Sequence, residues 1–346
     1  MIDEILEVDW SQVRFRRALS GLVAMLIAVV FFGLVDDIVV SGVMATLFVI
    51  AAGGTGPMSA RLPRMARLTV YGAIIGGLAF WSSDSVVAVA LVLGIAVYVG
   101  TLAAAAGPQS ARAGLFLTLW ALLALMLGSG DTEPSRVSIA FLAGGAIAIG
   151  VTAIRLWTLG EDETDDEDQS DELDTVEPQL SRSQQLGSAI LGPVGQFAIL
   201  RTIAVVAAVL LGFWWFASYP MWIAITVIVV VQPSSAQSAS IGVQRTLGTA
   251  LGVGVAIVVA QVLPQGDSGV VIAFLVSGLL MVAFMGANYT LFAAFLTAML
   301  VFGQRLAEAD AFEAGWERLL ATAVGAIMAF GVIAGAAALS ANTDQK

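Results

Sequence analysis

Apolar residues form long runs along most of this chain, and short segments rich in arginine, acid, proline or glycine separate them. Runs of roughly 20 apolar residues are typical of helices that cross a bilayer, whose hydrocarbon core is about 30 Å thick. The pattern predicts an all-α membrane protein with about twelve transmembrane helices. The predicted spans are residues 18–35, 38–52, 68–81, 85–106, 113–128 and 137–157 in the first half, and 197–217, 219–232, 246–262, 268–285, 289–302 and 319–339 in the second.

Several predicted spans are short. The span at 219–232 has 14 residues, which at about 1.5 Å per residue reaches only about 21 Å. Two explanations stay open. Other protein could surround the ends of these helices, as around the central site of a transporter, or the bilayer is thinner there and the boundaries are misplaced.

The two halves of the chain share short sequences in the same order. Phe-Leu-Thr at 116–118 recurs at 295–297, and Gly-Ala-Ile at 145–147 recurs at 325–327. Each copy has six spans, an even number, so the chain enters both copies from the same side of the membrane. The pattern therefore predicts two parallel six-span repeats, at 1–158 and 197–346. Further matching pairs are Arg17 and Arg201, Arg67 and Arg245, Arg136 and Arg318, and Gly72 with Gly76 against Gly248 with Gly252.

The segment between the repeats, residues 159–196, is strongly acidic. It carries 11 carboxylates from Glu161 to Glu177, a composition typical of a disordered, solvated linker on the cytoplasmic side. Binding of a partner or of cations by this linker is the alternative.

Basic residues predict the orientation. With the N-terminus inside, twelve of the 15 basic residues fall on the cytoplasmic side and three, Arg136, Arg305 and Arg318, fall outside. The positive-inside rule then places both termini in the cytoplasm, in a multi-pass protein of the cell membrane. Acidic residues at the extreme N-terminus do not fit a cleavable signal peptide.

Composition excludes several classes of function. Apolar residues make up 59% of the chain and charged residues 12%, whereas soluble domains have about 45–50% and about 25%, so lipid must cover much of the surface. The absence of cysteine and histidine excludes thiol nucleophiles, His-based triads and Cys/His zinc sites. We therefore expect no enzyme, no metal, no cofactor and no nucleic-acid partner.

Two motifs in the second half carry a resemblance to a known family. YPMWIAITVIVVVQPS begins at Tyr219, and GVQRTLGTALG covers 242–252. This pattern resembles the fusaric-acid-resistance or aromatic acid exporter family of membrane transporters, to which plant aluminium-activated malate channels are similar in their six-span unit. The first half keeps a loop with Pro57 but lacks Gly-Thr after its arginines. The resemblance implies export of organic anions.

Arg245 is the first candidate for binding such an anion. A helix expected to start near Thr246 would present unpaired N–H groups and a partial positive charge, and an arginine adds a bidentate donor for a carboxylate. Thr249 offers a hydroxyl one turn on, and the repeat predicts a counterpart around Arg67. The alternative is that these arginines only anchor the topology.

Other candidates have weaker support. Glycines in small-residue pairs favour close helix packing over ligand contact, and intramembrane threonines usually bond their own helix. Trp120 and Trp222 lie far enough inside spans to stack on an aromatic ring, and no clear carboxylate lies mid-span. The remaining substrate-binding candidates are Arg17, Arg201, Thr118 and Thr297, and the candidate packing glycines are Gly72, Gly76, Gly248 and Gly252.

These observations predict an organic-anion exporter for aromatic or small carboxylates, in which one six-span copy moves against the other. A passive anion channel and a non-transporting scaffold subunit remain the alternatives. Two copies in one chain could resemble a dimer of six-span subunits, and assembly into a homo-oligomer stays open.

Overall fold

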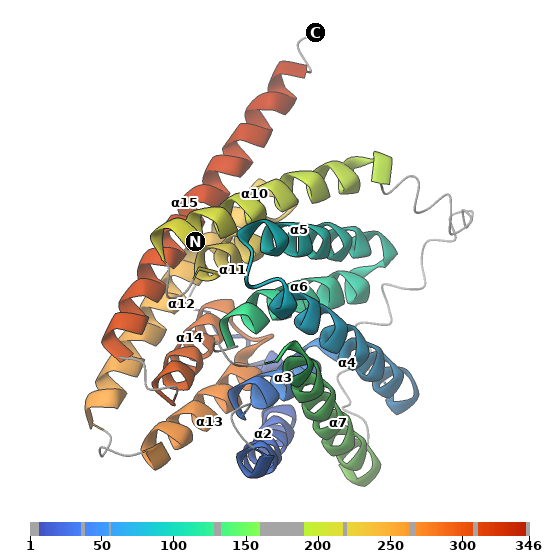
Figure 1. Cartoon of the computed structure of the whole chain (residues 1–346), viewed down its shortest axis with the longest axis vertical. Coiled ribbons are helices and arrows are strands. Elements are labelled where there is room, and N and C mark those ends of the chain that lie inside the picture. Colours follow the sequence, from blue (N-terminus) through green and yellow to red (C-terminus); the bar gives the residue numbers. More distant parts are fainter. Residues whose placement is uncertain are drawn as a thin grey trace. The chain divides into compact units, whose positions relative to one another are not determined.

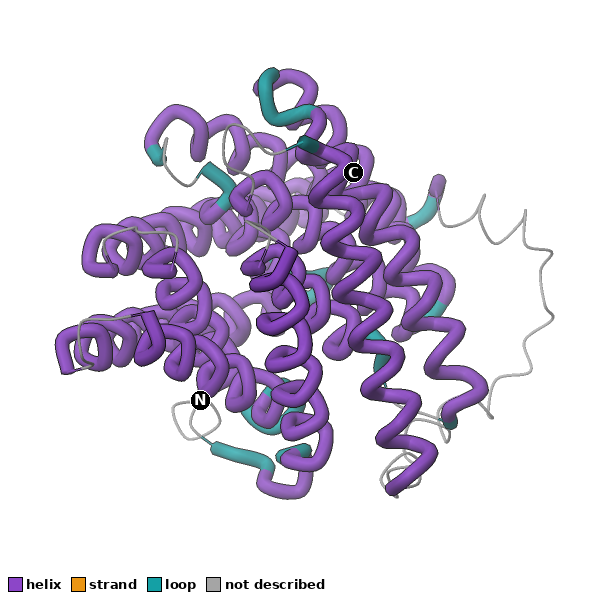
Figure 2. The backbone as a smooth tube through the Cα atoms, turned by 60° about the horizontal axis from the view of Figure 1, so that its bottom comes forward, coloured by secondary structure: helices purple, strands orange, loops and turns teal. Residues whose placement is uncertain are grey.

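The structure, a computed structural model, describes residues 7–35, 39–54, 57–127, 133–159, 190–216, 220–262, 267–306 and 311–343. Every regular element in these residues is a helix, which confirms the all-α prediction for them (Figures 1 and 2). The α-helices are α2 (Phe15–Val35), α3 (Val39–Ala52), α4 (Met58–Trp81), α5 (Val86–Leu102), α6 (Pro108–Leu127), α7 (Pro134–Leu159), α10 (Pro193–Trp215), α11 (Trp222–Val230), α12 (Ser235–Val262), α13 (Asp267–Phe284), α14 (Tyr289–Leu306) and α15 (Ala311–Thr343). Two short 3-10 helices, η1 (Trp10–Gln12) and η2 (Ala103–Ala106), complete the set.

Each predicted span falls on one of these twelve α-helices, and seven helical segments of the described residues are long and apolar enough to cross a membrane. The predicted acidic linker lies almost entirely outside the described residues. The membrane-length segments are Phe15–Leu34, Val86–Ala106, Pro134–Leu159, Pro193–Trp215, Ser235–Val262, Tyr289–Leu306 and Gly315–Gly335.

Large apolar side chains cover much of the outer surface. Leu34 is 83% exposed and Trp157 is 82% exposed, and similar side chains project from nearly every long helix. A soluble protein would not expose apolar patches on this scale. Hydrocarbon is the solvent that accommodates them, and the chain is a multi-pass membrane protein.

Two helices begin well before the predicted spans. α4 starts at Met58 instead of residue 68, and α12 starts at Ser235 instead of residue 246. The predicted starts were wrong because hydropathy measures transfer into lipid, whereas arginine, glutamine and alanine all extend a helix readily. Both helices therefore carry their arginines inside the helix and not in a preceding loop.

The short helices α3 and α11 are shielded by protein. α11 has nine residues, and all but Val229 are buried. It is therefore shorter than the predicted span at 219–232, and at about 1.5 Å per residue it reaches only about 14 Å. Ser41–Leu47 of α3 is buried throughout as well. Burial in protein is what permits helices too short to span a bilayer.

The α-carbon packing divides the chain into two compact units, one made of residues 27–202 and the other of residues 1–26 with 203–346. In the first, α4 packs on α6 and α7, α3 packs on α7, and α5 packs on α6. In the second, α12 packs on α14 and α15, α11 packs on α15, and α13 packs on α14.

The N-terminal segment is tied to the turn between α13 and α14. The Asp9 amide donates to the Ala287 carbonyl oxygen (3.1 Å) and the Arg14 amide to that of Ala283 (3.3 Å). The Asn288 side-chain amide returns a bond to the Glu7 carbonyl oxygen (2.8 Å). Residues from the start of the chain thus belong to the same unit as its last helices.

Glycine sets the distance between α12 and α14. A Cβ built on Gly248 would lie 2.5 Å from the carbonyl oxygen of Thr290, and one on Gly252 would meet the backbone at Ala294 and the Cβ of Thr297. In the other unit, Gly72 faces the ring of Phe141. Gly76 faces the Trp120 indole, whose Nε1 donates to the Gly72 carbonyl oxygen (2.9 Å).

We expect Gly248→Leu to destabilise the fold strongly, whereas Gly254→Leu on the same helix has little effect. The added side chain at Gly248 would collide with the α14 backbone, while nothing lies within 4 Å of a Cβ at Gly254. Overpacking typically costs about 1–3 kcal/mol, so the thermal unfolding midpoint of the detergent-purified protein should fall for Gly248→Leu alone. Equal midpoints for the two variants would contradict this packing.

Candidate functional site

Arg245 is buried in the middle of α12. The helix begins at Ser235, more than two turns before Arg245, so the predicted helix start near Thr246, and with it the anion site at a helix N-terminus, is wrong. The side chain is only 1% exposed, and its Nε and Nη2 atoms have no acceptor. What remains of the prediction is a buried guanidinium with free donors.

A second buried arginine, Arg318, lies near the first. It is 1% exposed, and all three of its side-chain nitrogens lack an acceptor. Its Cζ lies 3.6 Å from the centroid of the Trp222 ring on α11. The charges of Arg318 and Arg245 act on each other. Arg318 directly precedes the predicted span at 319–339, but α15 begins at Ala311, so Arg318 lies inside the helix.

Tyr289 completes the polar centre of this cluster. Its hydroxyl is buried beside the Arg245 guanidinium and lies in the electrostatic field of Arg318. α12, α14 and α15 meet here, since α12 packs on both of the others (Figure 1). The cluster defined by Arg245, Arg318, Tyr289 and Trp222 is called the arginine cluster below.

Two threonines with free hydroxyls lie on α12 and α14, which pack on each other. Thr249, one turn beyond Arg245, and Thr297 are both 0% exposed, and neither Oγ1 has a partner. Thr118, which matches Thr297 in the sequence repeat, instead donates to the Gly114 carbonyl oxygen of its own helix (2.8 Å). The two matched threonines therefore differ in hydrogen bonding.

The other predicted arginines have different surroundings. Arg67 is exposed on α4, beside the charge of Arg64. Arg17 is buried on α2. Arg201 is buried on α10, with its guanidinium 5.8 Å from the Phe197 ring centroid.

The arginine cluster carries two positive charges without a compensating carboxylate. Arginine stays protonated in proteins, and no carboxylate among the described residues forms an ion pair with Arg245 or Arg318. Burying an ion costs several kcal/mol even after relaxation. Stacking of Arg318 on Trp222 offsets about 2 kcal/mol of this burial cost. A hydrogen bond from a charged donor to an acceptor would offset about 1.5–3 kcal/mol. Since like charges also repel, the two arginines are held in the interior at a net cost in free energy.

One carboxylate of the described residues lies near the start of a membrane-length helical segment. Glu317 falls inside the segment Gly315–Gly335 of α15, because this helix starts before the predicted span at 319. Although it neighbours Arg318 in sequence, its charge interacts with that of Glu313, one turn earlier, and its Oε2 has no partner. Glu317 therefore does not neutralise the arginine cluster.

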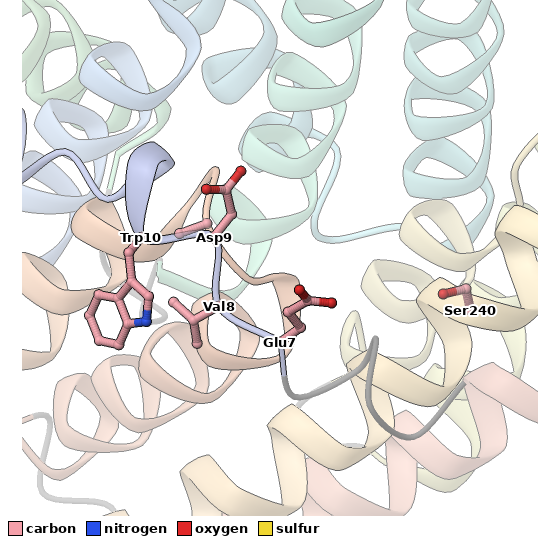
Figure 3. Close-up of a pocket in the computed structure, with 6 residues that line it drawn as sticks. Glu7, Val8, Asp9, Trp10 and Ser240 are labelled. Carbon is pink, nitrogen blue, oxygen red and sulfur yellow. The ribbon is translucent and has the colours of Figure 1, made fainter.

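A surface pocket near the N-terminus has the wrong charge for an anion. Its lining includes the carboxylates of Glu7 and Asp9 together with Trp10 and Ser240. Figure 3 shows the two acidic side chains on the N-terminal segment and Ser240 on α12. Two carboxylates would repel an anionic ligand, and no predicted site residue lines this pocket.

The family comparison agrees with these observations. Residues 203–332, which include the whole arginine cluster, match the family model described as fusaric acid resistance protein-like. The matched segment, which lies in the second half of the chain, is thus similar to this family. No curated protein and no solved structure matches the chain.

Arg318, Tyr289 and Trp222 were not among the substrate-binding residues proposed from the sequence. Arg318, like Arg245, directly precedes a long apolar run, and this shared position was the signal that could have identified it. Tyr289 carries no charge and gave no comparable signal in the sequence, although a buried tyrosine hydroxyl can donate a hydrogen bond. Trp222 was considered only as a surface for a ligand ring, whereas Arg318 lies over it.

We expect Arg318→Met to stabilise the fold. The variant removes a buried, uncompensated charge and keeps most of the volume, a change that is commonly neutral or stabilising by about 1–4 kcal/mol. Its thermal unfolding midpoint without ligand should rise. Arg305→Met on α14 is the control, because it removes the same charge from an exposed position, and its midpoint should stay near that of the wild type. A large drop for Arg318→Met would show that Arg318 holds the fold together.

Proposed function

We propose that this protein exports organic anions, aromatic or small carboxylates, across the cytoplasmic membrane, and that the arginine cluster binds them. The observation that carries the proposal is the pair of buried guanidiniums of Arg245 and Arg318 with free donors and no ion-paired carboxylate among the described residues. Ionisable residues inside membrane proteins typically mark substrate or ion pathways. The family match to fusaric acid resistance protein-like sequences also supports a transport function.

The proposal includes two parallel six-span repeats with both termini in the cytoplasm. The helices of the two units have equivalent neighbours. In the first unit α4 packs on α6 and α7, and in the second α12 packs on α14 and α15. Likewise, α3 packs on α7 and α11 packs on α15. This correspondence and the recurring tripeptides support a duplicated unit. Movement of one copy against the other would give alternating access.

The two copies differ where the anion would bind. The matching arginines of the first copy, Arg67 and Arg136, are both exposed, whereas Arg245 and Arg318 are buried. The first copy therefore has neither matching arginine in its interior, and we assign the binding site to the second copy.

Exposed and buried arginines have separate roles in this proposal. Arg67 is exposed near Arg64 and Arg112, whose positive charges act together there, and this surface attracts anions from the cytoplasm. Arg245 and Arg318, with Thr249 and Thr297, bind the substrate in the interior.

Transport by proteoliposomes tests the function directly. We expect saturable efflux of a labelled aromatic carboxylate that responds to an imposed pH gradient. Arg245→Ala should reduce the transport rate at low substrate by about 10- to 100-fold, because a hydrogen bond to a charged group is worth about 1.5–3 kcal/mol. Arg136→Ala is the control, since Arg136 is exposed on α7.

The result also separates the alternatives. Flux that follows voltage alone and saturates weakly would identify a passive channel. No flux of any of several carboxylates, with protein shown to be folded and inserted, would contradict the exporter and favour a scaffold subunit.

The matched threonines provide a second test. Thr297→Val should weaken substrate binding about 5- to 10-fold, because the unpartnered hydroxyl is replaced by a methyl group of similar size. Thr118→Val should have less than a twofold effect, since that hydroxyl already bonds its own helix. Binding is measured by the substrate-induced shift of the unfolding midpoint. Equal losses in both variants would contradict a ligand contact at Thr297.

A further inference from the structure

The arginine cluster carries two positive charges in one buried site. Arg245 projects from α12 and Arg318 from α15, both are 1% exposed, and their charges interact. We propose that the anion bound here is a dianion, a molecule with two carboxylates or an equivalent pair of negative charges. This inference rests on the proposed function and specifies the substrate class of the same site.

The free donors form two separate recognition edges. Nε and Nη2 of Arg245 lie on one edge of the guanidinium, and both lack an acceptor. Such an edge matches the two oxygens of a carboxylate. Arg318 has its Nε, Nη1 and Nη2 without acceptors. Two carboxylates of one molecule can therefore each find a guanidinium edge.

Trp222 orients the guanidinium of Arg318. The Arg318 Cζ lies 3.6 Å from the indole centroid, so the guanidinium face is in contact with the ring. Arginine stacked in this way keeps its in-plane N–H groups available. The same contact occupies this indole face, so a substrate ring cannot stack there while Arg318 does.

Charge balance separates a dianion from a monoanion. A monoanion at Arg245 or at Arg318 would leave the other guanidinium buried and uncompensated, and Glu317 does not neutralise it. A dianion balances both. The Tyr289 hydroxyl, beside Arg245, adds a neutral donor.

The test compares ligands of nearly equal shape and different charge. Phthalate and monomethyl phthalate are titrated into purified protein at pH 7.5, with binding read from the shift of the unfolding midpoint and by calorimetry. We expect wild type to bind phthalate at least tenfold more tightly, with one ligand per chain. In Arg318→Gln the preference should fall below threefold, because one guanidinium remains. Arg245→Gln provides the same test if Arg318→Gln does not fold.

Each alternative outcome has a distinct meaning. Equal affinity of the wild type for diacid and monoester, or two monoester molecules bound per chain, overturns the dianion inference but leaves the organic-anion function in place. The same loss of affinity for both ligands in Arg318→Gln overturns it as well. If the wild type neither binds nor transports diacids or monoacids of this kind, the inference and the proposed function both fail.

Discussion

Hydrocarbon offers no hydrogen-bond partner to a polar group, and the remaining features of this structure follow from that constraint. Backbone amides satisfy one another within helices, which explains the absence of any strand among the described residues. Most buried threonines, such as Thr46 and Thr118, bond carbonyl oxygens of their own helices. Helices too short to span the bilayer lie inside protein. Against this background, two arginines with free donors are a costly exception, and exceptions of this kind are expected at functional sites.

The sequence predicted the large-scale features because apolar runs reflect the solvent directly. All twelve predicted spans fall on helices, including the short one at α11. Helix starts were predicted poorly at α4, α12 and α15, since a change in hydropathy marks where arginine enters the chain and not where the backbone stops being helical. Arg245 was identified for a reason that the structure contradicts: its burial, and not a helix terminus, distinguishes it.

The cluster itself could not be predicted from spacing. Arg245, Tyr289 and Arg318 belong to three helices separated by loops, and Trp222 to a fourth. Their proximity depends on the close approach of α12 and α14 at Gly248 and on the packing of α15 against both α11 and α12. A single sequence indicates which residues are unusual in lipid, but which of them meet is decided by side-chain packing between distant segments.

The nine-residue helix α11 has a consequence for biogenesis. α11 is too short to cross a bilayer by itself, and its packing partner α15 is synthesised only after α12, α13 and α14. A ribosome therefore delivers α11 to the membrane long before the surface that buries it exists. Its final packing must wait until α15 has been made, and a chain that stalls before α15 leaves Trp222 and the apolar residues after it unassembled, as a target for membrane quality control.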